Sequence, residues 1–151
     1  MKPIYNRKIR FHYKILEEIE AGIVLTGRET KSIKTGEVNI SSAYVSVKDN
    51  EAYLLNASVY LYKYSAPDEN YDPLRPRKLL LKKREIFYLK GKLQQKGLTL
   101  VVTKVYTKHN RVKIMIALAK GQSKIDKREK IMKRDSDRKI KQSLKQRVQN
   151  R

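Results

Sequence analysis

Residues 99–118 run TLVVTKVYTKHNRVKIMIAL and predict a long β-hairpin. The first half is rich in β-branched residues, which favour extended strands. The polar turn Thr107-Lys108-His109-Asn110 interrupts the apolar residues, and residues 112–118 then form a second run of the same kind. The two runs are expected to pair as antiparallel strands, which favours a mainly β fold.

Other segments add strands to this hairpin. Residues 13–25 end in the apolar run AGIVL, where the glycine suggests a bulge or a close backbone approach. Residues 44–47 and 53–55 flank the polar turn KDNE, which is typical of a hairpin. The second of these strands is expected to continue through residues 59–61. The sequence thus predicts five or six antiparallel strands with short turns.

Two helices are predicted between the strands. Residues 26–34 form a short one closed by Gly36, and residues 77–95 carry apolar side chains at the 3.6-residue period until Gly97. Antiparallel strands with inserted helices can close into a small barrel, so we expect an OB-fold-like antiparallel β-barrel with two to three helices. An SH3-like barrel and an open α+β sheet are the alternatives.

The net charge points to an anionic partner. The chain has 151 residues, with 36 Lys and Arg against 15 Asp and Glu, which gives a formal charge of +21. Solubility needs a magnitude of only roughly 2–8 for a small domain. Nucleic acid is the first candidate, because each phosphate contact releases condensed counterions. A membrane surface or an acidic protein is the competing explanation.

The chain divides near Gly121. Residues 1–120 hold most of the apolar side chains and carry 24 Lys and Arg against 11 Asp and Glu. Residues 121–151 are a basic tail with 12 Lys and Arg against 4 Asp and Glu, too polar to bury a core. The tail has apolar residues at helical spacing, so we expect it to be disordered when free and helical on a polyanionic partner. A membrane-bound amphipathic helix is the alternative.

No enzymatic motif is evident. The chain lacks cysteine and a phosphate-binding glycine loop, and neither His12 nor His109 has a partner at catalytic spacing. Glu17, Glu18 and Glu20 lack a second acidic cluster with which to hold a metal. We therefore expect no catalysis, metal or cofactor. No apolar run suits a signal peptide or a membrane span, which favours a soluble, cytosolic protein.

One cluster of aromatic side chains and one cluster of cationic side chains are candidate contacts for nucleic acid. Tyr60, Tyr62 and Tyr64 alternate, which favours one face of a half-buried strand over a platform that stacks bases. Arg75, Arg77 and other cations flank the start of the second predicted helix. Cations there oppose the helix dipole, which is easier to explain if a phosphate binds; a solvated charged face is the alternative.

Several blocks in order resemble the SsrA-binding protein family, also called small protein B. They are NRK (6–8), EAGIVLTG (20–27), KSIKTG (31–36), RKLLL (77–81), AKG (119–121) and DKR (126–128). The resemblance covers nearly the full length of the chain. It implies an OB-type barrel that grips the elbow of the tRNA-like domain of transfer-messenger RNA (tmRNA), and a tail that acts on the ribosome.

The resemblance also implies the residues that bind RNA. The family's contact positions correspond to Asn6, Glu20, Leu80 and Lys113. Lys113 can neutralise a phosphate, and Asn6 can donate to base edges or sugar. Glu20 can accept from an amino group or a 2′-hydroxyl. Leu80 can meet an unstacked base, or can instead be ordinary helix core. The full predicted RNA-binding set is Asn6, Arg7, Glu20, Lys31, Lys34, Arg77, Lys78, Leu80, Lys113 and Lys120.

The tail departs from the family pattern. In the family it enters the vacant mRNA path of a stalled ribosome, becomes helical and replaces codon–anticodon pairing. The family commonly has Gly-Lys-Lys ahead of the DKR block, and often His or Tyr just before the Asp, where this chain has Gly-Gln-Ser and Ile125. Isoleucine cannot stack flat on a base. The residues expected at the decoding centre are Gly121, Lys124, Ile125, Asp126, Lys127 and Arg128.

The implied function is that of a non-enzymatic adaptor in trans-translation. Its expected partners are tmRNA and the ribosome, at the small-subunit decoding centre and mRNA channel. Elongation factor Tu and alanyl-tRNA synthetase are reached only through the RNA. The expected location is the bacterial cytoplasm, with no membrane contact, and the expected bound state is a monomer. The alternative is a general tRNA-binding or structural ribosome-associated OB-fold protein.

Overall fold

The structure is a computed structural model that describes the backbone of residues 1–122 and 124–149 and the side chains of residues 1–122 and 127–146. Its strands are Ile4–Tyr5 (β1), Tyr13–Ile23 (β2), Val38–Asn39 (β3), Tyr44–Lys48 (β4), Glu51–Leu55 (β5), Ser58–Val59 (β6), Arg77–Leu80 (β7), Leu98–Lys108 (β8) and Arg111–Gly121 (β9). The helices are Ile9–His12 (α1), Gly27–Lys34 (α2), Lys83–Leu93 (α3) and Lys124–Gln149 (α4). The chain separates into two compact units, Met1–Gly121 and Gln122–Arg151.

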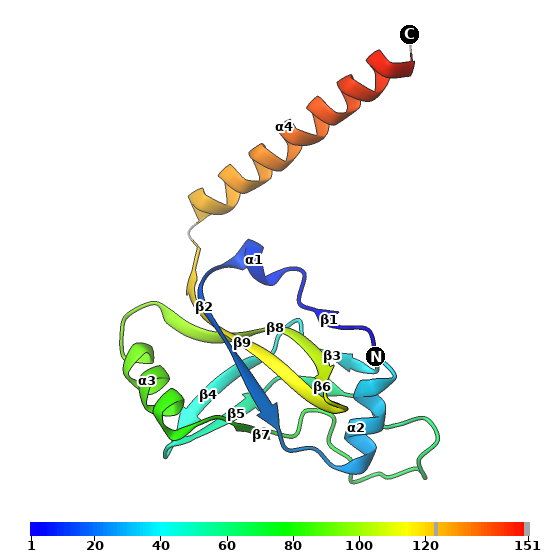
Figure 1. Ribbon diagram of the computed structural model, residues 1–151, viewed down its shortest axis with the longest axis vertical. Helices are drawn as coiled ribbons and strands as arrows, with labels where there is room; N and C mark the ends of the chain where they lie inside the picture. The colour runs from blue at the N-terminus through cyan, green and yellow to red at the C-terminus, as the bar shows by residue number, and fades with distance from the viewer. Residues whose placement is uncertain (123, 150–151) are drawn as a thin grey trace. The chain divides into compact units, whose positions relative to one another are not determined.

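The first unit is built on a closed antiparallel sheet (Figure 1). The strand order is β1-β8-β4-β5-β7-β2-β9, and a further pairing of β9 with β8 closes the ring. Closure leaves no exposed edge among the strands of the ring, as in a β-barrel. The expectation of a mainly β, OB-like barrel with helices is confirmed.

The long hairpin forms as the sequence predicts. Its turn is the two-residue pair His109-Asn110, with φ of 51° and 62°. Asp49-Asn50 makes the equivalent turn between β4 and β5, with φ of 53° and 61°. Two consecutive left-handed residues match the twist of the flanking strands, and Asn tolerates this conformation well. Each turn therefore fixes the register of its hairpin.

Large apolar side chains fill the interior of the first unit. Leu54, Leu100 and Ile116 from the strands are at most 2% exposed, and Leu89 of α3 is fully buried in the same cluster. α2 adds Ile33 to this core. The predicted helix over residues 26–34 is confirmed as α2. The Thr26 hydroxyl and the Glu29 carboxylate cap its N-terminus reciprocally.

Two expectations for the first unit are wrong. Residues 77–80 form strand β7 instead of the start of a helix, because their side chains alternate between buried and exposed; α3 begins only at Lys83. β5 ends at Leu55, where Asn56 turns with φ of 57°, so Tyr60, Tyr62 and Tyr64 lie in a loop outside any strand. Of the two features that Gly22 suggests, the bulge is not at this residue, because the register shift of β2 lies between Ile15 and Glu17.

The second unit contains α4. Its apolar side chains at Ile131, Met132, Ile140 and Leu144 are between 44% and 71% exposed, so this stripe is not packed in a core. That the tail becomes ordered only on a partner stays a prediction. Over the described residues, no helix is long and apolar enough to cross a membrane.

Candidate nucleic-acid interface

A row of side chains crosses the outer face of the closed sheet. Gly22 of β2 lies directly opposite Leu80 of β7 on one side and Lys113 of β9 on the other. Lys113 in turn lies opposite Tyr106 of β8. Directly paired residues point to the same face of a sheet, so these four positions form one continuous row. Glu20 joins this face because it lies two residues before Gly22.

This face is hollowed into a groove of about 510 Å³ beside α3. Four of the predicted residues line it: Glu20, Lys78, Leu80 and Lys113. Leu80 is 55% exposed, whereas the preceding Leu79 is buried, so the predicted apolar contact is presented to solvent. The alternative that Leu80 is helix core is wrong.

Gly22 keeps the floor of the groove open. A Cβ atom at this position would lie 3.2 Å from the Cβ of Leu80, closer than most such contacts. The glycine in the sequence therefore marks a close approach of β2 to β7, which is one of the two features that it suggested.

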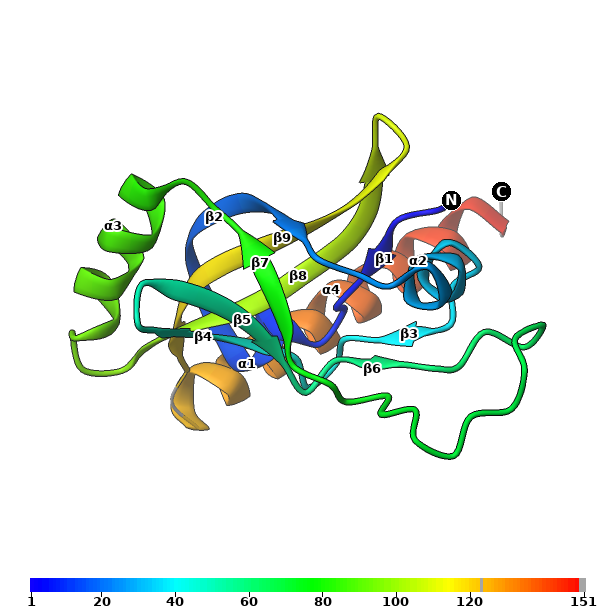
Figure 2. The same cartoon turned by 90° about the horizontal axis from the view of Figure 1, so that it is seen from below.

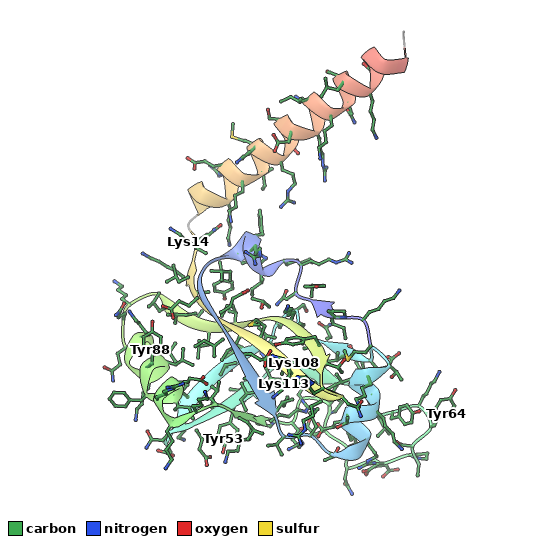
Figure 3. The ribbon with its side chains drawn as sticks, in the orientation of Figure 1. Lys14, Tyr53, Tyr64, Tyr88, Lys108 and Lys113 are labelled. Atoms are coloured by element: carbon green, nitrogen blue, oxygen red, sulfur yellow. The ribbon has the colours of Figure 1, made fainter. Side chains whose placement is uncertain are left out.

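Glu20 is held as a carboxylate. It accepts a hydrogen bond from the Tyr106 hydroxyl and lies 3.5 Å from the Lys108 ammonium. The Tyr106 bond chiefly lowers the pKa of Glu20, and the positive charges of Lys108 and Lys113 add to this against the effect of desolvation. Burial, together with the carboxylate, raises the pKa of Tyr106, so its phenol keeps its proton. Lys108 and Lys113, which both act on Glu20, are labelled in Figure 3.

Sequence reasoning missed Tyr106 and Lys108. A signal was available, because a two-residue turn at His109-Asn110 places Tyr106 opposite Lys113 by simple counting. The long β2–β9 pairing that brings Glu20 to them is non-local and has no such marker.

A second hollow continues the groove on the far side of Leu80. It measures about 280 Å³, and Thr30, Asn110 and Lys113 are among its lining residues. Lys34 of α2 donates to Asn110 at 3.1 Å and 3.2 Å, which ties the helix to the hairpin turn. Lys31 is exposed, with its ammonium 5.9 Å from the centre of the Tyr62 ring.

The prediction that Arg77 contacts RNA is wrong, because this side chain lies inside the protein. Its side chain is fully buried and donates to the Glu29 carboxylate, to the Ala57 carbonyl at 3.1 Å and to the Pro73 carbonyl at 3.1 Å. Burial raises the pKa of Glu29, but the Thr26 backbone N–H and the Arg75 and Arg77 guanidiniums outweigh it and lower the pKa. Arg77 therefore anchors the loop before β7 and leaves no group for a phosphate.

The predicted N-terminal residues lie elsewhere. Asn6 is 7% exposed, and its amide nitrogen donates at 3.1 Å to the carbonyls of both Ile40 and Val102. Both of its amide hydrogens are thus used inside the protein. Asn6 and Arg7 line a separate hollow of about 260 Å³ beside Lys104.

Within the groove, Lys78 pairs with Glu51 at 3.2 Å. The remaining predicted positions lie outside the groove. Lys120 is exposed near the end of β9, which finishes at Gly121. On α4, Lys127 is half-buried and Arg128 is exposed. The side chains of Lys124, Ile125 and Asp126 lie outside the described residues.

Side chains that could bind a metal ion are not gathered in the part of the chain that the structure describes. The described residues contain no cluster of three or more His, Asp or Glu side chains that could hold a metal ion. The groove is instead lined by three lysines, three glutamates and the exposed Leu80. Glu51 pairs with Lys78 and Glu85 caps α3, which leaves Glu20 and Lys113 beside Leu80 as the polar groups on the row.

Comparison with known proteins identifies the family. The family model described as SmpB protein matches residues 3–146. The chain belongs to the SmpB family. An SsrA-binding protein of Persephonella marina is 47% identical over 98% of this chain and 97% of its own length. Those of Chloroflexus aggregans and Thermosynechococcus vestitus are 48% and 46% identical, over 95% and 94% of this chain and 90% and 93% of their own lengths.

The similarity extends to a solved structure with the same fold. The match is to a chain of the structure described as "tmRNA-SmpB: a journey to the center of the bacterial ribosome". That chain is 41% identical, with a TM-score of 0.67 over 81% of this chain and 85% of its own. The resemblance found in the sequence is thus confirmed at the level of family and fold.

Proposed function

We propose that this protein binds tmRNA and delivers it to stalled ribosomes as an adaptor of trans-translation. Membership of the SmpB family, relatives named for binding SsrA RNA and a structural match from a tmRNA-SmpB ribosome complex support this function. The observation within this chain that carries the proposal is the row that places Glu20, Leu80 and Lys113 around one groove.

Each of these side chains has a role that suits folded RNA. Lys113 neutralises a phosphate, and Leu80 packs on an unstacked base. Glu20 keeps free acceptor positions beyond its bond to Tyr106, because a carboxylate has about four lone-pair sites. These sites accept from a 2′-hydroxyl or an exocyclic amine, groups that neighbour phosphates in RNA.

The other predicted positions take different roles in this proposal. Lys78 adds positive charge within the groove, Lys31, Lys34 and Lys120 add it elsewhere on the barrel, and Arg7 does so beside Asn6. Asn6 positions the N-terminal segment, since its donors are used internally. Arg77 is left out of the interface.

The basic tail is proposed to act on the ribosome. Residues 121–151 would occupy the mRNA channel and decoding centre, with Gly121, Lys124, Ile125, Asp126, Lys127 and Arg128 nearest the codon site. The protein would work without catalysis, in the bacterial cytoplasm and as a monomer when bound. Elongation factor Tu and alanyl-tRNA synthetase would act on the same RNA without touching the groove.

Sequencing of the RNA that co-purifies with the tagged full chain from cells tests this function. We expect one dominant species, tmRNA, and its loss when Lys113 is replaced by alanine. A broad mixture of tRNAs would instead support the general tRNA-binding alternative.

A further inference from the structure

Phe87 is an exposed aromatic side chain on an otherwise basic helix. α3 points Leu89 into the core, whereas Phe87 is 78% exposed. Its neighbours on the helix surface, four and three residues before it and three after it, are Lys83, Arg84 and Lys90. A single exposed phenylalanine is ordinary. Phe87, however, is surrounded by these three cations. None of them offers its ring an apolar surface to pack on within the helix.

A hollow lies beside this ring and joins the groove. It measures about 530 Å³ and is lined by Asn50, Lys83, Arg84, Ile86 and Phe87. Asn50 and Ile86 also line the groove that contains Lys113. The surface around Phe87 is therefore continuous with the proposed RNA interface.

The charge of this helix selects the kind of partner. Residues 82–92 contain five Lys and Arg and one carboxylate. That carboxylate, Glu85, accepts the backbone N–H of Lys82 at 3.2 Å, so it caps the helix. An occupant of this hollow must be anionic and must also offer a flat apolar surface to the Phe87 ring. RNA meets both conditions, because every base has a π-face and every nucleotide a phosphate.

We propose that an unstacked base of the bound RNA stacks on Phe87, with the adjoining phosphate between Lys83 and Arg84. This inference rests on the proposed function and extends its contact surface from the groove onto α3. It assigns to α3 a direct part in RNA recognition, beyond the burial of Leu89 in the core.

A tryptophan at position 87 gives a direct test. The chain contains no tryptophan, so Phe87→Trp in the full chain creates a single fluorescent reporter at the site. The titrant is a transcript of the tRNA-like domain of tmRNA. Stacking predicts that the tryptophan emission is quenched in proportion to the RNA bound. Unchanged emission at saturating RNA would overturn the proposal.

Tyr64→Trp is the matched control. Tyr64 is 75% exposed in the loop between β6 and β7, which Figure 2 shows at the opposite end of the barrel from α3. Residues 60–76 carry two cations against three carboxylates, so this loop is much less basic than α3. We expect its emission to change little. Equal quenching at both positions would mean that the signal is not specific to α3 and would also overturn the proposal.

Affinity measurements separate an aromatic role from a general apolar one. Phe87→Ala and Phe87→Leu should each weaken RNA binding by roughly tenfold, whereas Phe87→Tyr should retain it, since stacking on a base needs the ring. The salt dependence should stay unchanged in all three, because no charge is altered. Wild-type affinity in Phe87→Ala, or a loss traced by sedimentation to disrupted self-association, would refute the inference.

The two proposals fail in different ways. If the wild-type chain does not bind the transcript, the proposed function fails. If the wild-type chain binds, Lys113→Ala weakens binding and Phe87→Ala does not, the function stands and only the role of Phe87 is rejected.

Discussion

Replacing Glu29 with alanine should destabilise the barrel severely. Glu29 is 1% exposed and Arg77 is fully buried, so the substitution leaves a buried guanidinium without its counter-charge. Arg75 also loses its acceptor, which lies 2.5 Å away. Removing one partner of a buried ion pair costs about 3–5 kcal/mol. Loss of the acceptor of the Thr26 backbone N–H, the Glu29 half of the capping box, adds about 1 kcal/mol. The total is a large share of the roughly 5–15 kcal/mol that stabilises a typical domain.

The assay is equilibrium unfolding in urea, followed by tyrosine fluorescence of the full chain. Glu51→Ala is the matched control, because Glu51 pairs with Lys78 at 3.2 Å on the surface, where the two side chains are 43% and 47% exposed. Exposed pairs contribute little. We expect Glu29→Ala to unfold at a much lower urea concentration than the wild type. The midpoint of Glu51→Ala should stay almost unchanged. Equal small shifts in both variants would refute the structural role of the Glu29–Arg77 pair.

The same pair predicts how stability depends on pH. Folding lowers the pKa of Glu29, so the folded state binds its proton less readily than the unfolded state does. This contribution to stability is complete above the ordinary glutamate pKa and is lost as the pH falls through the lowered value. Glu29→Gln should flatten the acid side of the stability profile. An unchanged acid slope in this variant would contradict the assignment.

Three further predictions concern the groove and the tail. Gly22→Val should push Leu80 out of the groove, weaken RNA binding and destabilise the fold by about 1–3 kcal/mol, measured by titration and urea unfolding; unchanged RNA affinity would show that Leu80 is not required. Tyr106→Phe should raise the pKa of Glu20 toward its ordinary value, as read from the carboxyl carbon in NMR spectra, because the chief cause of its lowering is removed; an unaltered titration would disprove that bond. Truncation after Gly121 should keep RNA affinity and abolish peptide tagging on stalled ribosomes, and loss of RNA binding at moderate salt would contradict the division of roles.

Local signals in the sequence predict much of the barrel. The turns at Asp49-Asn50 and His109-Asn110 need residues that tolerate left-handed backbone, and both lie between runs of strand-forming residues. The register of each hairpin then follows by counting outward from the turn. α2 is equally local, since its capping residues, Thr26 and Glu29, are three positions apart.

The start of the second helix could not be predicted in the same way. The apolar side chains from Leu79 to Leu93 fit a helical period, yet residues 77–80 pair with β2 and β5. What holds Arg77 inside is Glu29, a residue 48 positions earlier. Nothing near Arg77 in the sequence marks that contact, so its basic neighbours predict a surface position for it.

The groove could be predicted only in part from the sequence. Leu80, Lys113 and Glu20 were predicted as site residues through a resemblance to a family, and their mutual placement depends on pairings between distant strands. Phe87 lies outside the blocks that resemble the family. Its exposure follows only from the structure, in which Leu89 is on the buried side of α3.

The salt dependence of RNA binding tests the central claim most directly. The affinity of the full chain for the tRNA-like domain of tmRNA is measured over a series of salt concentrations for the wild type, Lys113→Ala and Lys96→Ala. Lys96 is an exposed lysine that follows α3 and does not line the groove, so it controls for net charge. We predict weaker binding and a slope smaller by about one unit for Lys113→Ala alone. An unchanged slope for Lys113→Ala, or the same change in both variants, would contradict recognition of RNA through this groove.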